Sequence, residues 1–150
     1  MKFSKYRFIT SFFAIAIALL LDLKLAPIIG WSPSLYLTIL ITLASFVSLW
    51  ELIFFALLGM WIFNSGPALG LGTIAIGILP LATFWSKKLL PWTPSLNNIV
   101  FVALAVTIFY FALDYSFIIK IPQIFFEDIL ISEIFGIVAF QSFGYVFKEK

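Results

Sequence analysis

The sequence contains no cysteine and no histidine. Disulfide bonds, thiolate chemistry and metal sites built from cysteine or histidine are therefore excluded. Charged residues are also scarce, at 11% of the chain against about 25% in soluble proteins. The net charge of +2 is too small to indicate a nucleic-acid-binding protein. Only carboxylates, hydroxyls and lysines remain for chemistry, and no pair of them has the spacing of a nucleophile and its base. We expect no enzyme, no metal and no cofactor.

Apolar residues are correspondingly abundant. They make up 63% of the 150 residues, against roughly 45–50% in soluble proteins. A soluble domain of this size could not bury so much apolar surface, because its surface is large relative to its volume. The sequence therefore predicts one domain over residues 1–150, an all-α membrane protein with a compact bundle of about six transmembrane helices. A span needs about 20 mostly apolar residues, and the candidate stretches are residues 8–25, 33–49, 50–63, 69–85, 99–119 and 129–147.

Glycine, proline and polar residues separate these stretches. The longest polar connection covers residues 91–98, and residues 50–63 are short enough for a tilted span, a half-helix or part of a re-entrant turn. The first stretch has the basic start of a signal peptide. However, Asp22 and Lys24 stand where small residues should precede a cleavage site, so we expect an uncleaved span.

The basic residues predict how the bundle is oriented. With six spans, only Lys24 and Lys120 fall on one side, and the other basic residues all fall on the opposite side. The positive-inside rule places the larger group, and with it both termini, in the cytoplasm. Without a third span, the basic residues would be divided between the two sides. The larger group consists of Lys2, Lys5, Arg7, Lys87, Lys88, Lys148 and Lys150.

Several carboxylates lie in or near the apolar stretches. Asp114 lies deepest, and two interpretations stay open: an intramembrane functional group, or a solvated or paired residue at the interface. Asp22 is expected at the outer interface. Glu127 and Asp128 are expected to oppose the dipole at the N-terminus of their own helix.

The start of the fourth stretch is rich in glycine, with Gly66, Gly70 and Gly72 near Pro67. Gly66 and Gly70 have the G-x-x-x-G spacing that permits helices to approach closely. No P-loop lysine and serine follow, so a nucleotide loop is excluded. The pattern predicts a kinked start of a tightly packed helix.

At this segment the order of features resembles the MreD family of bacterial rod shape-determining proteins. That family typically has a glycine in the third span, followed by an S-G-[small or Pro]-x-[Leu/Phe]-G turn into the fourth. Gly59 and the run from Ser65 to Gly70 match these positions. The family usually carries an aspartate shortly before the turn, where this sequence has Asn64.

The resemblance implies a fold like that of the S components of energy-coupling-factor transporters. It also implies a multi-pass protein of the bacterial inner membrane, a non-enzymatic part of the cell-elongation machinery that supports peptidoglycan synthesis through helix-face contacts. The implied partners, besides membrane lipid, are an MreC-like protein, RodA, a class B penicillin-binding transpeptidase and the MreB filament.

An S component itself is the main alternative, as the substrate-binding subunit of a vitamin or micronutrient transporter. It predicts a small-molecule pocket on the outer side of the membrane. Trp31, Asn64, Asp114 and Tyr115 could contribute to such a pocket.

Overall fold

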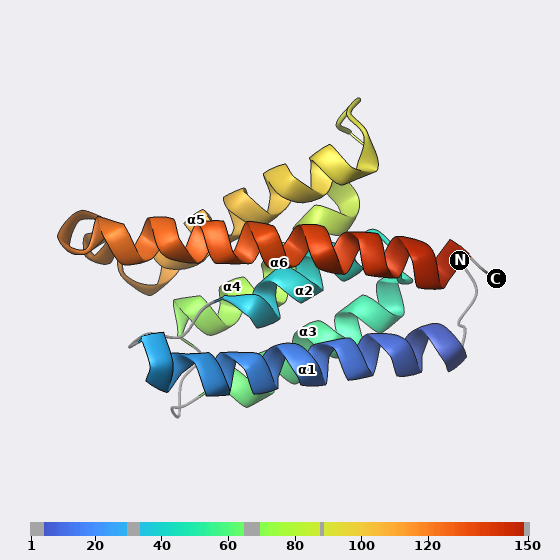
Figure 1. Ribbon diagram of the computed structural model, residues 1–150, viewed down its shortest axis with the longest axis horizontal. Helices are drawn as coiled ribbons and strands as arrows, with labels where there is room; N and C mark the ends of the chain where they lie inside the picture. Colours follow the sequence, from blue (N-terminus) through green and yellow to red (C-terminus); the bar gives the residue numbers. More distant parts are fainter. Residues whose placement is uncertain (1–4, 30–33, 65–69, 88, 149–150) are drawn as a thin grey trace.

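The computed structural model describes residues 5–29, 34–64, 70–87 and 89–148. These residues form helices and turns without any strand, so the predicted all-α fold is confirmed. The helices in these ranges are α1 (Lys5–Ile29), α2 (Leu35–Leu43), α3 (Leu49–Phe63), α4 (Leu71–Ser86), α5 (Pro94–Lys120) and α6 (Pro122–Lys148) (Figure 1).

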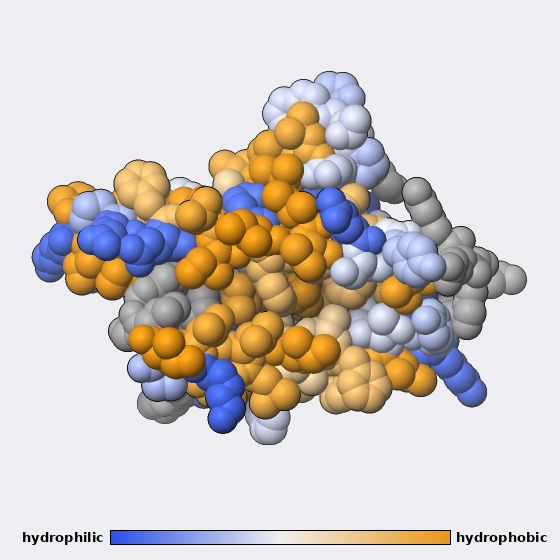
Figure 2. Space-filling view, viewed as in Figure 1, coloured by the Kyte–Doolittle hydropathy of each residue, from blue (hydrophilic) through white to orange (hydrophobic). Residues whose placement is uncertain are grey.

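Three helices are long and apolar enough to cross a membrane, over Lys5–Ile28, Pro94–Ser116 and Pro122–Phe147. Two shorter apolar helices accompany them, α3 and α4. On the face shown in Figure 2, apolar residues cover most of the middle of the molecule, and hydrophilic residues lie toward both ends and along part of the upper middle. The described chain is therefore an all-helical membrane protein.

Successive helices run in alternate directions, so α1 begins and α6 ends at the same end of the bundle (Figure 1). The Arg7 guanidinium lies 5.8 Å from the centroid of the Phe147 ring, which joins these two helix ends. Lys5 belongs to this end, and Lys87 follows the end of α4 that points the same way.

Lys24 and Lys120 lie toward the other end of the bundle, Lys24 before the last turn of α1 and Lys120 in the last turn of α5. The described basic residues are thus distributed between the two ends as the sequence predicted. Lys2, Lys88 and Lys150 lie outside the described residues, and the side chain of Lys148 is likewise not described.

Helix α2 occupies the centre of the bundle. All of its nine residues are buried, and it touches every other helix of the described ranges. The sequence predicted a span over residues 33–49, and this boundary is wrong. At 1.5 Å per residue the helix is only about 13 Å long, whereas the hydrocarbon core is about 30 Å thick.

The chain leaves α2 through a tight turn that hydropathy does not reveal. The N–H of Ser45 donates to the carbonyl of Thr42 at 3.1 Å, and the N–H of Phe46 donates to that of Leu43 at 2.9 Å. Helix α3 then begins with a capping box, in which Ser48 and Glu51 exchange hydrogen bonds. The apolar run of residues 33–63 therefore contains two helices and a capped turn.

Helices α5 and α6 both begin earlier than predicted. Residues 91–98 were expected to be a polar connection, but α5 starts at Pro94, and α6 starts at Pro122 instead of residue 129. Proline suits the first helical position because the N–H that it lacks would have no partner there. Asn97, Asn98 and Asp128 lie within these additional turns and are buried.

Helices α1 and α6 each bury one stripe of residues. Ser11, Ile15, Ala18 and Asp22 recur along one face of α1, and all four are buried. The corresponding stripe of α6 consists of Phe125, Asp128, Ser132, Gly136, Ala139, Phe143 and Phe147. Both stripes carry aspartate together with serine, and both face α2.

Close helix approach occurs at Gly59 and not at Gly70. A Cβ atom on Gly59 would overlap the ring of Tyr36, whose hydroxyl donates to the carbonyl of Phe55 at 2.7 Å. Gly70 is the N-cap of α4, and a Cβ there would meet nothing within 4 Å. The close approach predicted at Gly70 is therefore wrong. Gly72 does pack tightly, against Leu113, whereas Gly66 lies outside the described residues.

Replacement of Gly59 by alanine is expected to destabilise the protein. The ring of Tyr36 is buried and held by its hydrogen bond, so the added methyl group overpacks the α2–α3 contact, at a cost of about 1–3 kcal/mol. Thermal unfolding in detergent would show a lowered midpoint. Gly144→Ala is the control, because a Cβ at Gly144 has open space. Equal midpoints for the two variants would contradict the close contact.

Candidate functional site

The N-terminus of α2 is the most polar place inside the bundle. The first hydrogen bond within the helix runs from the N–H of Thr38 to the carbonyl of Ser34, at 3.0 Å. The N–H groups before Thr38 therefore need partners from elsewhere. Ser34 is the N-cap residue, yet its side chain makes no capping hydrogen bond to its own helix. Acceptors for the N–H groups of Ser34, Leu35 and Tyr36 come from two other helices.

Asp128 of α6 supplies the first acceptor. Its carboxylate accepts from the Ser34 N–H at 2.9 Å and from the Ser34 hydroxyl at 2.6 Å. The Ser132 hydroxyl, one turn further along α6, donates at 3.3 Å, and the Tyr110 hydroxyl of α5 donates as well. Four donors thus surround one fully buried carboxylate, which offsets much of the cost of removing it from water.

Asp22 of α1 supplies the second acceptor. One of its oxygens accepts from the Leu35 N–H at 3.3 Å, and the other accepts from the Tyr36 N–H at 3.1 Å. Both aspartates therefore cap α2 from neighbouring helices, where negative charge also interacts favourably with the positive end of the helix dipole. This arrangement ties α1 and α6 to the central helix.

A lysine side chain lies at the opposite end of α2. The Lys87 ammonium donates to the carbonyl of Ala44, the C-cap residue of α2, and lies 4.1 Å from the centroid of the Phe84 ring. A positive charge at a helix C-terminus complements the dipole in the same way as the carboxylates do at the start. Lys87, predicted to set topology, therefore also holds α2 to the end of α4.

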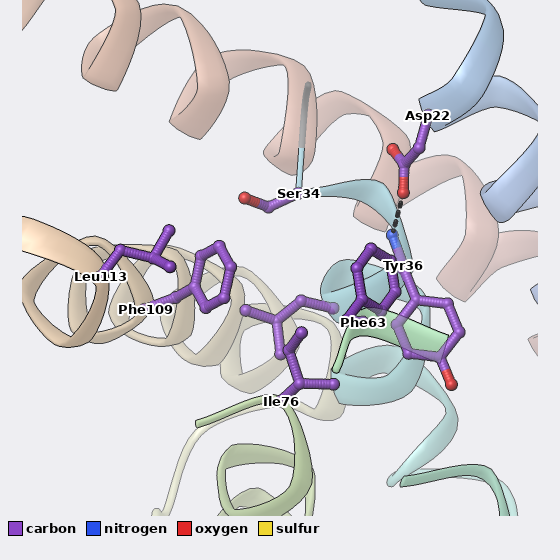
Figure 3. Close-up of a pocket in the computed structure, with 8 residues that line it drawn as sticks. Asp22, Ser34, Tyr36, Phe63, Ile76, Phe109 and Leu113 are labelled. Atoms are coloured by element: carbon purple, nitrogen blue, oxygen red, sulfur yellow. Dashed lines mark hydrogen bonds between the residues drawn. The ribbon is translucent and has the colours of Figure 1, made fainter. Parts of the chain in front are cut away.

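A cavity of about 210 Å³ adjoins the capped end of α2. It lies among five helices, and Figure 3 shows the Asp22 carboxylate at one side and the Phe109 ring across from it. Its polar lining comes from Asp22 and Ser34, and the rest is mainly aliphatic and aromatic. The main walls are Asp22 of α1, Ser34 and Tyr36 of α2, Phe63 of α3, Ile76 of α4 and Phe109 of α5.

The structure corrects the expected roles of two aspartates. Asp22, expected at the outer interface, is only 5% exposed and faces α2. Asp128, expected to oppose the dipole of its own helix, is in the second turn of α6 and caps α2 instead. Glu127 is exposed and accepts a hydrogen bond from Gln123 at 2.9 Å, so the two neighbouring carboxylates differ completely in environment.

Asp114 does not take part in the cavity. It is exposed and lies near the end of the apolar part of α5. Its backbone leaves the helical conformation, and its carboxylate accepts from the Ser116 N–H at 2.9 Å. Asn64, the exposed C-cap of α3, and the exposed Tyr115 do not line the cavity either. Trp31, Ser65, Gly66 and Pro67 lie outside the described residues.

The sequence did not predict that Asp22 and Asp128 both cap α2, although the neighbours of each aspartate on its own helix indicate a buried position. Asp22 lies on the same helix face as Ser11 and Ala18, and Asp128 lies four residues before Ser132. Polar and small residues on one face of an apolar helix indicate the side that faces protein rather than lipid. Nothing in the pattern shows which other helix end these carboxylates reach.

Comparison of the chain with family models, with curated proteins and with solved structures finds no match.

Asp128→Asn is expected to lower the free energy of unfolding by about 2 kcal/mol or more, since hydrogen bonds to a charged group contribute about 1.5–3 kcal/mol each. The amide nitrogen would also face donors where an acceptor is needed. Thermal unfolding in detergent would measure the loss. Glu127→Gln, the same change at the adjacent exposed carboxylate, should leave the midpoint unchanged. A comparable loss in both variants would contradict the capping role of Asp128.

Proposed function

We propose that this chain is an MreD-like, non-enzymatic component of the bacterial cell-elongation machinery. In this role it sits in the inner membrane and supports peptidoglycan synthesis through contacts of its helix faces. Its partners are an MreC-like protein and, through it, RodA, a class B penicillin-binding transpeptidase and the MreB filament.

The contact around Gly59 is the observation that supports this proposal most directly. In the resemblance, this glycine belongs to the third span and precedes the S-G turn. In the structure, α3 packs there against Tyr36 of the central helix, with no room for a side chain. Where packing leaves no room for a side chain only glycine fits, which is a physical reason for a family motif to contain glycine at that position. Gly70, the last residue of the same motif, begins α4 as its N-cap.

Large apolar surfaces remain for partners and lipid. Helix α1 directs an outer stripe away from the bundle, and this stripe includes Phe13, Leu20 and Leu23, each more than half exposed. Helices α5 and α6 expose similar residues, among them Phe111, Phe126 and Leu130. Such faces suit a protein that acts by lateral contact within the membrane.

The proposal includes an orientation, with both ends of the chain in the cytoplasm and six passes of the chain between the two ends of the bundle. The shared end of Lys5, Arg7 and Lys87 supports it, because basic residues are retained on the cytoplasmic side. The short α2 is one of these passes but does not cross the bilayer core alone.

Single cysteines can test this orientation, because the chain has none of its own. In spheroplasts, a membrane-impermeant maleimide is expected to label Lys24→Cys and Lys120→Cys, whose side chains are exposed at the outer end. Lys5→Cys should react only after the membrane is permeabilised. Labelling of Lys5→Cys in intact spheroplasts would show that the orientation is the opposite one. Labelling of only one of Lys24→Cys and Lys120→Cys would show that the number of passes between them differs from the proposed one.

The cavity favours one second candidate, the substrate-binding S component of an energy-coupling-factor transporter. A largely apolar cavity with a few convergent polar groups is the usual form of a small-molecule site. The cavity adjoins the start of α2, on the half of the bundle away from Lys5 and Arg7. This half is the outer half in the proposed orientation.

Affinity purification of the tagged chain from its native membrane separates the two candidates. We expect an MreC-like protein and wall-synthesis proteins to be recovered, and depletion of the chain to make rod-shaped cells round. Recovery of paired ATPase subunits with a small membrane coupling protein, and no change in cell shape, would overturn the scaffold proposal in favour of the transporter subunit.

A further inference from the structure

The two buried aspartates differ in how fully their oxygens are used. A carboxylate has two oxygens with about four positions that can accept hydrogen bonds. Asp128 receives four donors, two from Ser34 and one each from Ser132 and Tyr110. Asp22 receives only two among the described residues, at the longer distances of 3.1 and 3.3 Å. Asp22 therefore retains unused acceptor capacity.

That unused capacity lies at the wall of the cavity. Asp22 lines the cavity, whereas Asp128 lies beyond it and is closed off by its own donors. No lysine or arginine of the described residues lines the cavity, so no basic side chain among its walls neutralises Asp22. In Figure 3 the Asp22 carboxylate points toward the Tyr36 N–H, Ser34 lies to one side, and the Phe109 ring lies across the cavity.

The other walls favour an apolar or aromatic group. Phe63 and Tyr36 lie ring to ring with centroids 5.2 Å apart, and Phe109 approaches from α5. A dry cavity of about 150 Å³ is enough for benzene, so 210 Å³ holds an aromatic ring together with a short side chain. Aromatic faces also attract a nearby cation, which adds to the attraction of the carboxylate.

We propose that this cavity binds a small organic ammonium ion with an apolar or aromatic body, and that Asp22 accepts a hydrogen bond from the ammonium group. The ligand then supplies the donors and the positive charge that the buried carboxylate lacks. Its body fills the space between Phe63, Ile76 and Phe109.

Other classes of ligand fit less well. An anion would be repelled by the Asp22 carboxylate, and the N–H groups of Ser34, Leu35 and Tyr36 already donate to Asp128 and Asp22. An uncharged hydrocarbon fills the volume but excludes water from Asp22 without replacing its hydrogen bonds, which is costly. The expected order of affinity is therefore cation, neutral donor, then anion.

The inference is independent of the scaffold proposal, and it gives a substrate class to the transporter-subunit candidate. Co-purification of partners and binding of a ligand are separate measurements. A protein that binds an ammonium ligand can still be recovered with wall-synthesis proteins, and a failure of either result leaves the other standing.

Phenethylamine, 2-phenylethanol and 3-phenylpropionate have similar size and differ in charge, so they are suitable probes for calorimetric titration of the purified full chain. We expect saturable binding of phenethylamine with a dissociation constant at least about 10-fold lower than that of the alcohol, as one charge-assisted hydrogen bond provides. The carboxylate should bind weakest. Equal affinity for amine and alcohol, or no saturable binding of the amine, would overturn the proposal on the unaltered protein.

Variants then locate the site. Asp22→Asn is expected to remove the preference for the amine, whereas Asp114→Asn, the same change at an exposed aspartate outside the cavity, should preserve it. Ile76→Trp fills the cavity while leaving Asp22 in place, and it should abolish binding of amine and alcohol alike. Undiminished binding to Ile76→Trp, or an equal loss in Asp114→Asn, would show that the amine binds elsewhere.

Discussion

The fold depends on satisfying the two ends of a short buried helix. Helix α2 has nine residues, all buried in an apolar bundle, so the protein itself must supply most partners for the hydrogen-bonding groups at its two ends. Asp22 and Asp128 accept from its first N–H groups, and Lys87 donates at its far end. Three helices are thereby fixed around one, by directional bonds and by complementary charge. In a membrane this matters more than in water, because apolar contact alone does not favour protein over lipid.

Packing around α2 follows from this arrangement. Once its start is tied to α1 and α6, the Tyr36 side chain points toward α3, where Gly59 leaves space for its ring. Gly136 does the same on α6, where a Cβ would come within 3.3 Å of both Thr38 and Val102. The same geometry leaves a cavity at the capped end of α2. Asp22 thus has two roles. It accepts hydrogen bonds from the start of α2, and its remaining acceptor capacity is available to a ligand in the cavity.

Hydropathy predicted the all-helical class, and the charge pattern predicted the end of the bundle at which each described basic residue lies. They failed at boundaries where polar residues lie inside a helix, as with Asn97, Asn98 and Asp128, because an apolar window treats buried polar residues as loop. They failed also at α2, whose capped ending within a continuous apolar run has no hydropathy signal. The site was predicted poorly for a related reason. Asp114 stands out in the sequence, yet it is exposed and lies where the backbone of α5 leaves the helical conformation. Asp22 and Asp128 act through helix ends that are remote in sequence.

The hydrogen bonds from Ser34 to Asp128 connect positions 94 residues apart along the chain. A polypeptide is made from its N-terminus, so α1 to α5 are synthesised before the acceptor for Ser34 exists. Until α6 arrives, the core helix has an incomplete start and a side open toward lipid or toward assisting proteins. Biogenesis of this chain is therefore completed by its last helix. Loss of α6 would remove the acceptor for Ser34 and so destabilise the start of α2 at the centre of the molecule, far from the truncation in sequence.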